Sequence, residues 1–331
     1  MLPVVAVLAA ALCFATTGTA LALADVDGSP VSVGAARVLV GGGILGIIAL
    51  VHRAMARGEA PRRMLRADPR SRVPAWVIVL VGAVGVLAYQ PAFFAGTRMN
   101  GVAIGTVVAL GSAPIATGVL DALIRRRRPS IRWFVATAIA LVGVVLVSGM
   151  VSGTGTGTGT GTDTMINPLG LLASFGAGAS YALYTIASKL LLDRGWETTS
   201  TMGGIFGCAA VLSVPLLLGT SPFGSSAAWL LTPEGIVLAL WLGVVTTAVA
   251  YLLFGWGLRR LSPTTVATLT LAEPLGATLL GILVLHEQLS PMATVGIVVI
   301  AAGLTVLSLP GRAQTPSSAS GFQTPGRSSA P

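Results

Sequence analysis

The sequence is poor in charge, cysteine and histidine. Charged residues make up 9% of its 331 residues, whereas a typical soluble domain carries about 25%, so an ordinary soluble enzyme is excluded. Cys13 and Cys208 lie in separate apolar runs and form no CxxC pair, which gives no basis for a disulfide framework or a zinc site. The two histidines are far apart along the chain. We therefore expect no metal and no cofactor.

The chain also lacks the patterns of enzymes and ATP-driven pumps. It contains no HExxH motif, no paired carboxylates and no Ser-His arrangement. Residues 153–162 alternate Gly and Thr, but no GK[ST] follows them, so this segment is not a phosphate-binding loop. We predict no catalytic residues and no enzymatic activity.

Apolar residues are abundant instead. Hydrophobic residues make up 54% of the chain, and the mean hydropathy is +0.87. A helix needs about 20 apolar residues to cross the hydrocarbon core, and a strand interpretation fails because the runs are too long and do not alternate. We predict an all-α polytopic membrane protein with ten transmembrane helices, near 4–24, 31–51, 74–96, 102–123, 133–151, 168–191, 201–219, 235–257, 264–285 and 291–309.

The basic residues predict the topology. The net charge is +9, and eighteen of the 20 basic residues lie in the C-terminal tail or in the connections after the second, fourth, sixth and eighth spans. These segments share one side of the membrane, and the positive-inside rule makes that side cytoplasmic, together with both termini. Basic runs between apolar spans suit membrane orientation, so we expect no nucleic-acid partner.

The first span has a second interpretation. Ala22-Leu23-Ala24 before Asp25 resembles a signal-peptide cleavage site. However, no Lys or Arg precedes the apolar run, and the run is longer than a usual signal core. We therefore expect a retained helix.

The Gly-Thr segment divides the predicted spans into two groups of five. It reads as a flexible linker. We predict a first five-helix repeat over 1–151, a linker over 152–167, a second repeat over 168–310, and a disordered cytoplasmic tail over 311–331. Because five is odd, the second group must enter the membrane from the opposite side.

The two groups also resemble each other in sequence. An alignment of the two groups without gaps pairs Pro114 with Pro274, and a slightly larger offset pairs Tyr89 with Tyr251. Such inverted repeats are typical of secondary transporters.

The most specific motif lies in the second group. Glu273-Pro274 falls in the ninth predicted span, and Glu287 falls in the turn before the tenth. With these residues the chain, over about 1–310, resembles the drug/metabolite transporter (DMT) superfamily and its EamA-type ten-helix members. The first half departs by having Ala113 where the second has Glu273, an asymmetry that the family commonly shows.

The resemblance implies a secondary-active transporter that moves small metabolites, often amino acids or toxic amphiphiles, usually outward by alternating access. Its partners are then a small-molecule solute, the lipid bilayer and protons. With 19 Arg against a single Lys, the composition suggests a GC-rich bacterial genome and thus the bacterial inner membrane. The alternative is a non-transporting membrane scaffold or sensor.

Glu273 is the leading candidate for a functional residue. A charge at mid-bilayer costs about 2.5–3.5 kcal/mol on insertion scales and therefore normally faces a cavity or a partner. Glu273 can bind a cationic group or carry a proton. Alternatively, it bonds to backbone groups freed by Pro274.

Arg37 lies about six residues from the outer end of the second span, roughly 9 Å at 1.5 Å per residue. It is either an anchor that reaches the headgroups or a cavity residue that binds a carboxylate.

Tyr89-Gln90-Pro91 is the densest polar cluster in the first half, and its repeat mate runs from Tyr251 to Trp256. A helix interrupted by Pro can expose backbone groups to a central site, and aromatic rings can hold a cation. We predict that these side chains line a substrate cavity, with packing as the alternative for Tyr251.

The sixth predicted span adds two tyrosines. Tyr181 and Tyr184 share a helix face, and Phe14 matches Tyr181 when the two halves are aligned at a larger offset. We include all three as cavity candidates, although helix packing is the commoner role of such residues. Pro91, Pro114 and Pro274 are candidate hinges.

Three further polar residues receive simpler interpretations. We expect Asp121 to pair with nearby arginines, and His286 and Glu287 to serve the turn between the last two spans.

Overall fold

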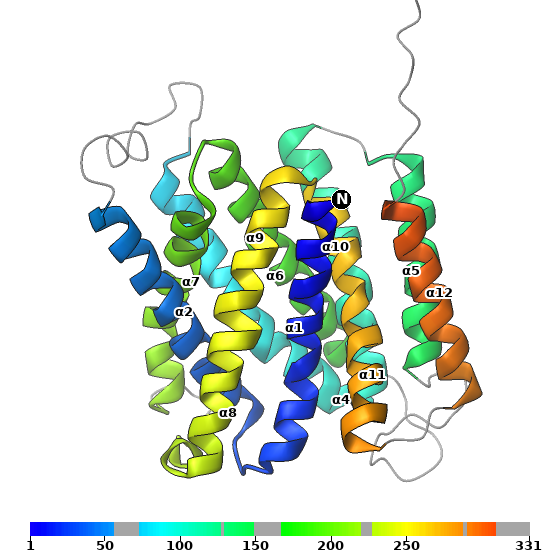
Figure 1. The fold of residues 1–331 in the computed structure, drawn as a ribbon, viewed down its shortest axis with the longest axis horizontal. Helices are drawn as coiled ribbons and strands as arrows, with labels where there is room; N and C mark the ends of the chain where they lie inside the picture. Colours follow the sequence, from blue (N-terminus) through cyan, green and yellow to red (C-terminus); the bar gives the residue numbers. More distant parts are fainter. Residues whose placement is uncertain (56–72, 127–128, 149–166, 220–226, 287–289, 309–331) are drawn as a thin grey trace, which may run out of the picture.

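A computed structural model describes residues 1–55, 73–126, 129–148, 167–219, 227–286 and 290–308, apart from the side chains of Val102, Ala103 and Arg125. Every regular element in these ranges is helical (Figure 1). The elements are α1 (Leu2–Ala24), α2 (Pro30–Met55), α4 (Ala75–Arg125), α5 (Ile131–Val147), α6 (Pro168–Asp193), α7 (Thr198–Leu217), η1 (Ala228–Leu231), α8 (Pro233–Gly243), η2 (Val244–Val249), α9 (Ala250–Arg260), α10 (Pro263–Leu269), η3 (Thr270–Ala272), α11 (Glu273–Leu285) and α12 (Pro291–Ser308).

These elements form the predicted spans. Nine helical segments of the described chain are long and apolar enough to cross a membrane, and α5 adds a shorter apolar helix of 17 residues, about 26 Å long at 1.5 Å per residue. Element α4 contains two spans, because Gly101 adopts φ 82° and breaks the helix between Ala75–Gly101 and Ile104–Ile124. The polytopic helical fold is therefore confirmed, and its span boundaries differ from the predicted ones by a few residues.

Short polar motifs fix where several helices begin. Asn167, Thr232 and Ser262 each precede a proline, and each side-chain oxygen accepts a hydrogen bond from a backbone N–H in the first turn. Such residues satisfy amide groups that have no partner within the helix, and proline fits the first helical position because it has no N–H to satisfy. Ser130 and Ser290, which occupy equivalent positions in the two halves, cap α5 and α12 in the same way.

The helices pack in a pattern that relates the two halves. Helix α2 packs on α7, and α5 packs on α12 at one edge of the bundle (Figure 1). Helix α6 lies against both spans of α4, and α1 lies against α9 and α11. When each span of the first half is exchanged for its counterpart in the second half, the same pairs result. The contacts of α1 with α9 and α11 become those of α6 with the two spans of α4, and the α2–α7 and α5–α12 pairs are unchanged.

Glycines allow the close approach of α2 and α7. A Cβ atom added to Gly42 would collide with the carbonyl oxygen of Phe206, and one added to Gly203 would collide with the carbonyl of Leu45. The backbones are therefore in direct contact, as is common between membrane helices.

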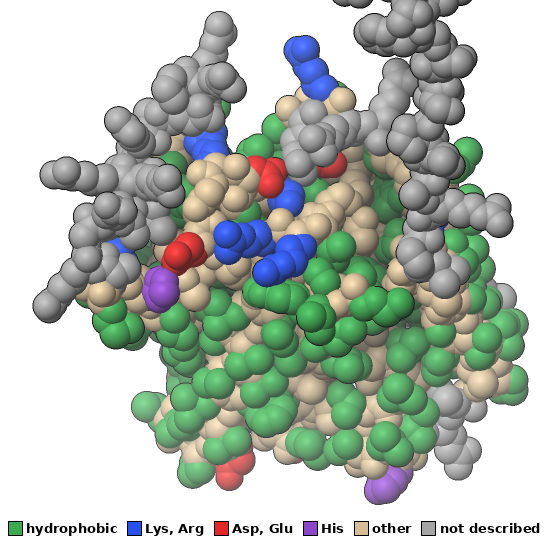
Figure 2. Space-filling view, turned by 45° about the horizontal axis from the view of Figure 1, so that its top comes forward, with side chains coloured by type: hydrophobic (Ala, Val, Ile, Leu, Met, Phe, Trp, Pro, Cys, Tyr) green, Lys and Arg blue, Asp and Glu red, His purple; other side chains and the backbone are tan. Residues whose placement is uncertain are grey.

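Charge is distributed unequally between the two ends of the bundle. Within the described chain, the basic residues near the end that carries the N-terminus are Arg53, Arg126, Arg132, Lys189, Arg194, Arg259 and Arg260. The opposite end has Arg98 together with Asp25, Asp27 and Glu234. Figure 2 shows blue side chains gathered toward the upper end, above an apolar girdle. The other arginines of the predicted basic connections, the Gly-Thr linker and the tail lie outside the described residues.

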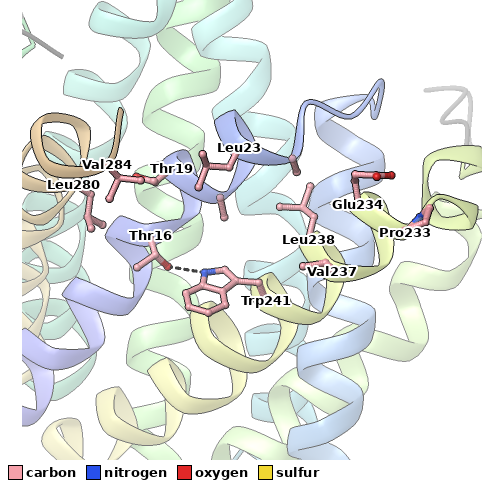
Figure 3. Close-up of a pocket in the computed structure, with 12 residues that line it drawn as sticks. Thr16, Thr19, Leu23, Pro233, Glu234, Val237, Leu238, Trp241, Leu280 and Val284 are labelled. Carbon is pink, nitrogen blue, oxygen red and sulfur yellow. Dashed lines mark hydrogen bonds between the residues drawn. The ribbon is translucent and has the colours of Figure 1, made fainter. Parts of the chain in front are cut away.

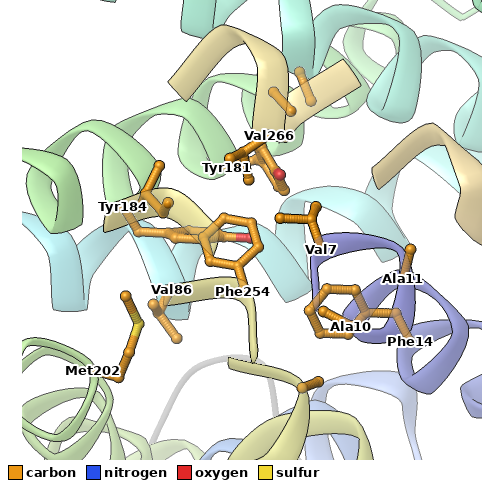
Figure 4. Packing of buried hydrophobic residues seen from close by; sticks show 14 of the residues in the cluster. Val7, Ala10, Ala11, Phe14, Val86, Tyr181, Tyr184, Met202, Phe254 and Val266 are labelled. Carbon is orange, nitrogen blue, oxygen red and sulfur yellow. The ribbon is translucent and has the colours of Figure 1, made fainter. Parts of the chain in front are cut away.

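Two buried clusters hold the bundle together. The larger one occupies the centre and includes Phe14, Tyr184, Phe206 and Phe254 (Figure 4). The smaller one lies at the end of the bundle away from the N-terminus and is centred on Trp229, whose Nε1–H donates to Ser32 Oγ. This second cluster closes that end of the bundle between α1, α2, α7 and α8.

Candidate functional site

The eighth span is interrupted at its centre. Between α8 and α9 the helix widens into the π-helix η2 over Val244–Val249. The Thr246 and Thr247 hydroxyls both donate to the carbonyl oxygen of Leu242, at 2.7 and 2.9 Å. A π-bulge commonly marks a functional position, because it displaces the normal hydrogen-bond ladder.

Arg37 is attached to this interruption. Its Nε donates to Thr247 Oγ1 at 3.2 Å, and its Nη2 donates to the carbonyl oxygen of Thr246 at 2.9 Å. The guanidinium therefore points into the bundle and links α2 to η2. This geometry contradicts the interpretation of Arg37 as a headgroup anchor.

Beside Arg37 lies a small cavity of about 40 Å³. It is lined by Arg37, Val38, Val86, Tyr89, Gln90, Tyr184, Phe206, Thr247 and Tyr251. A water molecule needs roughly 10–15 Å³, so the cavity has room for a few waters and is too small for a metabolite. We call it the tyrosine cavity.

Aromatic side chains form one wall of the tyrosine cavity. The hydroxyl groups of Tyr184 and Tyr251 are 3.2 Å apart, within hydrogen-bonding distance. The Tyr251 ring lies 4.0 Å from Phe206 and 5.1 Å from Phe14, measured between centroids. The Tyr181 ring lies 5.1 Å from that of Tyr184, measured between centroids (Figure 4). The Tyr181 hydroxyl is hydrogen-bonded to Thr270 Oγ1 at 3.0 Å.

The opposite wall offers polar groups that are not engaged. Gln90 lines the cavity and packs against the backbone at Gly34. Within the described part of the chain, the Gln90 amide and the Tyr89 hydroxyl have no hydrogen-bond partner, while the Tyr89 ring stacks on Phe93 at 5.9 Å. Polar groups left free in an apolar span are available to a ligand.

Glu273 lies at the second helix interruption. The 3₁₀ turn η3 ends at Ala272, and α11 begins with Glu273-Pro274. The half-buried carboxylate has no hydrogen bond or ion pair among the residues described, so the backbone bond expected of a purely structural role is not present there. Glu273 is near enough to Arg37, Tyr89 and Tyr251 to interact with them electrostatically.

Other candidate residues do not line the tyrosine cavity. Trp256 is one turn from Arg260, whose guanidinium carbon lies 4.0 Å above the indole ring. Pro91 and Pro114 lie within the two spans of α4. His286 ends α11 with φ 55°, which fits the predicted turn role.

Asp121 is buried near the end of α4. Glu287 lies outside the described residues.

Sequence reasoning missed Phe206, Phe254 and the Thr246-Thr247 pair. The two phenylalanines are indistinguishable by pattern from lipid-facing ones. The adjacent threonines in an apolar span were a usable signal, because such hydroxyls bond back to the helix backbone and bend it. No group of three or more potential metal ligands occurs in the part of the chain that the structure describes.

Comparison with known proteins identifies relatives across nearly the whole chain. The model of the EamA-like transporter family matches residues 1–149 and 168–309. The chain is 35% identical over 308 residues to a protein of Bacillus subtilis (strain 168) named as the uncharacterized transporter YwfM, covering 93% of this chain and 94% of that protein. It is 27% identical over 240 residues to Protein PecM of Dickeya dadantii (strain 3937), covering 70% and 73% respectively.

A crystal structure has the same fold. The two chains superpose with a TM-score of 0.70 at 20% sequence identity, over 92% of this chain and 96% of the other.

Proposed function

Because the chain belongs to the EamA-like transporter family and is therefore a membrane transporter rather than an enzyme, we propose that it exports small zwitterionic metabolites such as amino acids. The observation that carries the proposal is the presence of two opposite charges, Arg37 and Glu273, at or near the tyrosine cavity. Arg37 borders it on one side, and Glu273 lies within electrostatic range of Arg37 and two of the tyrosines.

These two charges match the two ends of an amino acid. The Arg37 guanidinium has five N–H donors, and its bonds to Thr246 and Thr247 use two of them. The remaining donors can bind a substrate carboxylate, while Glu273 binds the ammonium group. The aromatic wall then contacts the apolar part of the solute.

We propose that Glu273 also couples transport to protons. A carboxylate in an apolar span needs either a proton or a cationic partner. Binding of the substrate ammonium would release the proton from Glu273, and reprotonation would release the substrate. Proton binding and substrate binding would therefore alternate at the Glu273 side chain.

Alternating access follows from the proposed inverted repeats. The family model matches both halves separately, and the helix pairs are preserved when the halves are exchanged. The movement would open the tyrosine cavity to one side at a time, as in other transporters built from inverted repeats.

For the location, we propose the cytoplasmic membrane of a bacterium, with both termini in the cytoplasm. The support is the excess of basic residues at the end of the bundle that carries the N-terminus.

An efflux experiment tests this proposal. Cells that express the wild type, Glu273→Gln or Gln90→Leu at equal membrane levels are loaded with labelled amino acids, and retention is followed with and without a proton uncoupler. We expect faster loss of at least one amino acid in the wild type, removed by Glu273→Gln and by the uncoupler. Gln90→Leu should lower the rate of efflux without lowering abundance, because Gln90 lines the cavity without a protein partner among the described residues.

Three results would contradict parts of the proposal. If the Glu273→Gln variant exports amino acids as fast as the wild type at every pH, Glu273 does not couple transport to protons. A matched fall in abundance and efflux for Gln90→Leu would assign that residue to packing. Unchanged retention of every amino acid would contradict amino-acid export and leave import, another substrate or the scaffold or sensor alternative, in that order.

A further inference from the structure

A second and much larger hollow lies on the outside of the bundle. It is a groove of about 560 Å³ between α1, α8 and α11, at the end away from the N-terminus (Figure 3). Its lining residues are Thr16, Thr19, Ala20, Leu23, Ala24, Pro233, Glu234, Val237, Leu238, Trp241, Leu280 and Val284. This volume lies within the roughly 300–1,000 Å³ of small-molecule sites.

The groove is separate from the tyrosine cavity, and the two share no lining residue. Trp241 Nε1 donates to Thr16 Oγ1 at 3.1 Å, and this bond connects α8 to α1 across the groove (Figure 3). Phe14, two residues before Thr16, contacts Tyr251 of the tyrosine cavity. Because residues two apart point to different faces of a helix, the groove and the aromatic wall lie on different faces of α1.

The groove is shaped for a chain that lies in one leaflet. Glu234 is in the first turn of α8, and Trp241 lies seven residues further along, which is roughly 10 Å at 1.5 Å per residue. The hydrocarbon core is about 30 Å thick, so the groove extends from one membrane surface through most of one leaflet.

Charge at the mouth of the groove selects the headgroup. Glu234 is the only ionisable side chain among the described lining residues, and it is exposed. Asp25, which directly follows the lining residue Ala24, adds a second exposed acid at the same end. An apolar groove that ends at carboxylates is complementary to an alkyl chain with a cationic head.

We propose that this groove binds a single-chain cationic amphiphile from the bilayer, with its alkyl chain between α1, α8 and α11 and its ammonium group at Glu234. The site is distinct from the tyrosine cavity, and binding at it does not depend on the transport proposed above.

Photolabelling of the full-length protein in phosphatidylcholine nanodiscs tests the proposal. The probe is dodecylamine with a diazirine at the end of its chain, and labelled peptides are identified by mass spectrometry. We expect labels within 16–24, 233–241 and 280–284. Unlabelled dodecylamine should compete, and neutral dodecanol, which lacks the ion pair with Glu234, should compete about fivefold more weakly.

Matched variants separate the site from simple partition into lipid. Val237→Phe fills the groove and should abolish labelling, whereas Leu240→Phe, on an exposed part of α8 outside the lining, should not. Glu234→Gln should weaken competition about fivefold, the effect of an exposed ion pair of about 1 kcal/mol. Asp27→Asn removes an exposed acid outside the lining and should leave competition unchanged.

Three outcomes would overturn the proposal. Equal competition by dodecanol would show that the groove takes any alkyl chain, including those of phospholipids. If Val237→Phe is labelled as strongly as the wild type, the probe reacts from the surrounding bilayer and not from the groove. If Glu234→Gln and Asp27→Asn weaken competition equally, Glu234 acts only through the general surface charge and does not bind the ammonium group directly.

Discussion

Replacement of Arg37 by Leu should destabilise the protein markedly, although Arg37 lies in a membrane span. The side chain donates two hydrogen bonds to η2, at 2.9 and 3.2 Å. A hydrogen bond from a charged group contributes about 1.5–3 kcal/mol, so the loss of both costs at least about 3 kcal/mol. At roughly 2 °C per kcal/mol for a large domain, the melting temperature should fall by at least about 6 °C.

Thermal unfolding in detergent, followed by tryptophan fluorescence, measures this fall. Arg98→Leu is the matched control, because Arg98 is exposed and has no hydrogen-bond partner within the described ranges. We expect a shift of less than about 1 °C for this variant, in keeping with the small effect of surface substitutions. Arg37→Lys keeps the charge but cannot reproduce both bonds of the planar guanidinium, so its melting temperature should lie between those of wild type and Arg37→Leu.

Equal melting temperatures for Arg37→Leu and Arg98→Leu would refute the reasoning. That result would mean that the Arg37 side chain reaches the headgroups rather than η2, and the anchor interpretation would return. Full stability of Arg37→Lys would show that the positive charge alone, and not the forked geometry, holds η2.

Two further predictions concern helix packing. Gly42→Ala should lower membrane abundance several-fold on quantitative immunoblots, because its Cβ would collide with the Phe206 carbonyl, whereas Gly43→Ala, which meets no atom within 4 Å, should be neutral. Lys189→Met should lower the melting temperature by about 4 °C, since buried Lys189 donates to the Leu258 carbonyl at 2.9 Å and pairs with Asp193 at 3.3 Å. An Arg259→Met variant as unstable as Lys189→Met would contradict this role.

The spans could be predicted because each depends on local composition. About 20 apolar residues in succession have few alternatives to a membrane helix, and motifs such as Ser262-Pro263 mark helix starts without tertiary information. The partner of Arg37 could not be predicted, because the bonded Thr247 is far away in the sequence. The π-helix could be predicted only in part: the adjacent threonines indicate a bend in the span, but one extra residue in a turn changes neither hydropathy nor length enough to be recognised.

The candidate site could be predicted at positions where a polar residue stands in an otherwise apolar span. Gln90 and Arg37 stand out in apolar spans, and both line the tyrosine cavity. Tyr89 and Tyr251, which the comparison of the two halves pairs, line the same cavity from opposite halves. Phe206 gives no such signal, because an apolar aromatic in a membrane span can face lipid, another helix or a cavity at similar cost.

The charges around the cavity break the symmetry of the two halves. The alignment that pairs Pro114 with Pro274 places Ala113 of α4 opposite Glu273, so at this pair of positions the carboxylate comes from the second half. Both interrupted spans, with η2 and η3, also belong to the second half. Arg37, from the first half, bonds to one of these interruptions. The proposed movement of one half against the other would therefore break the Arg37–η2 bonds or move η2 together with α2. We propose this junction as the point where substrate binding and movement are coupled.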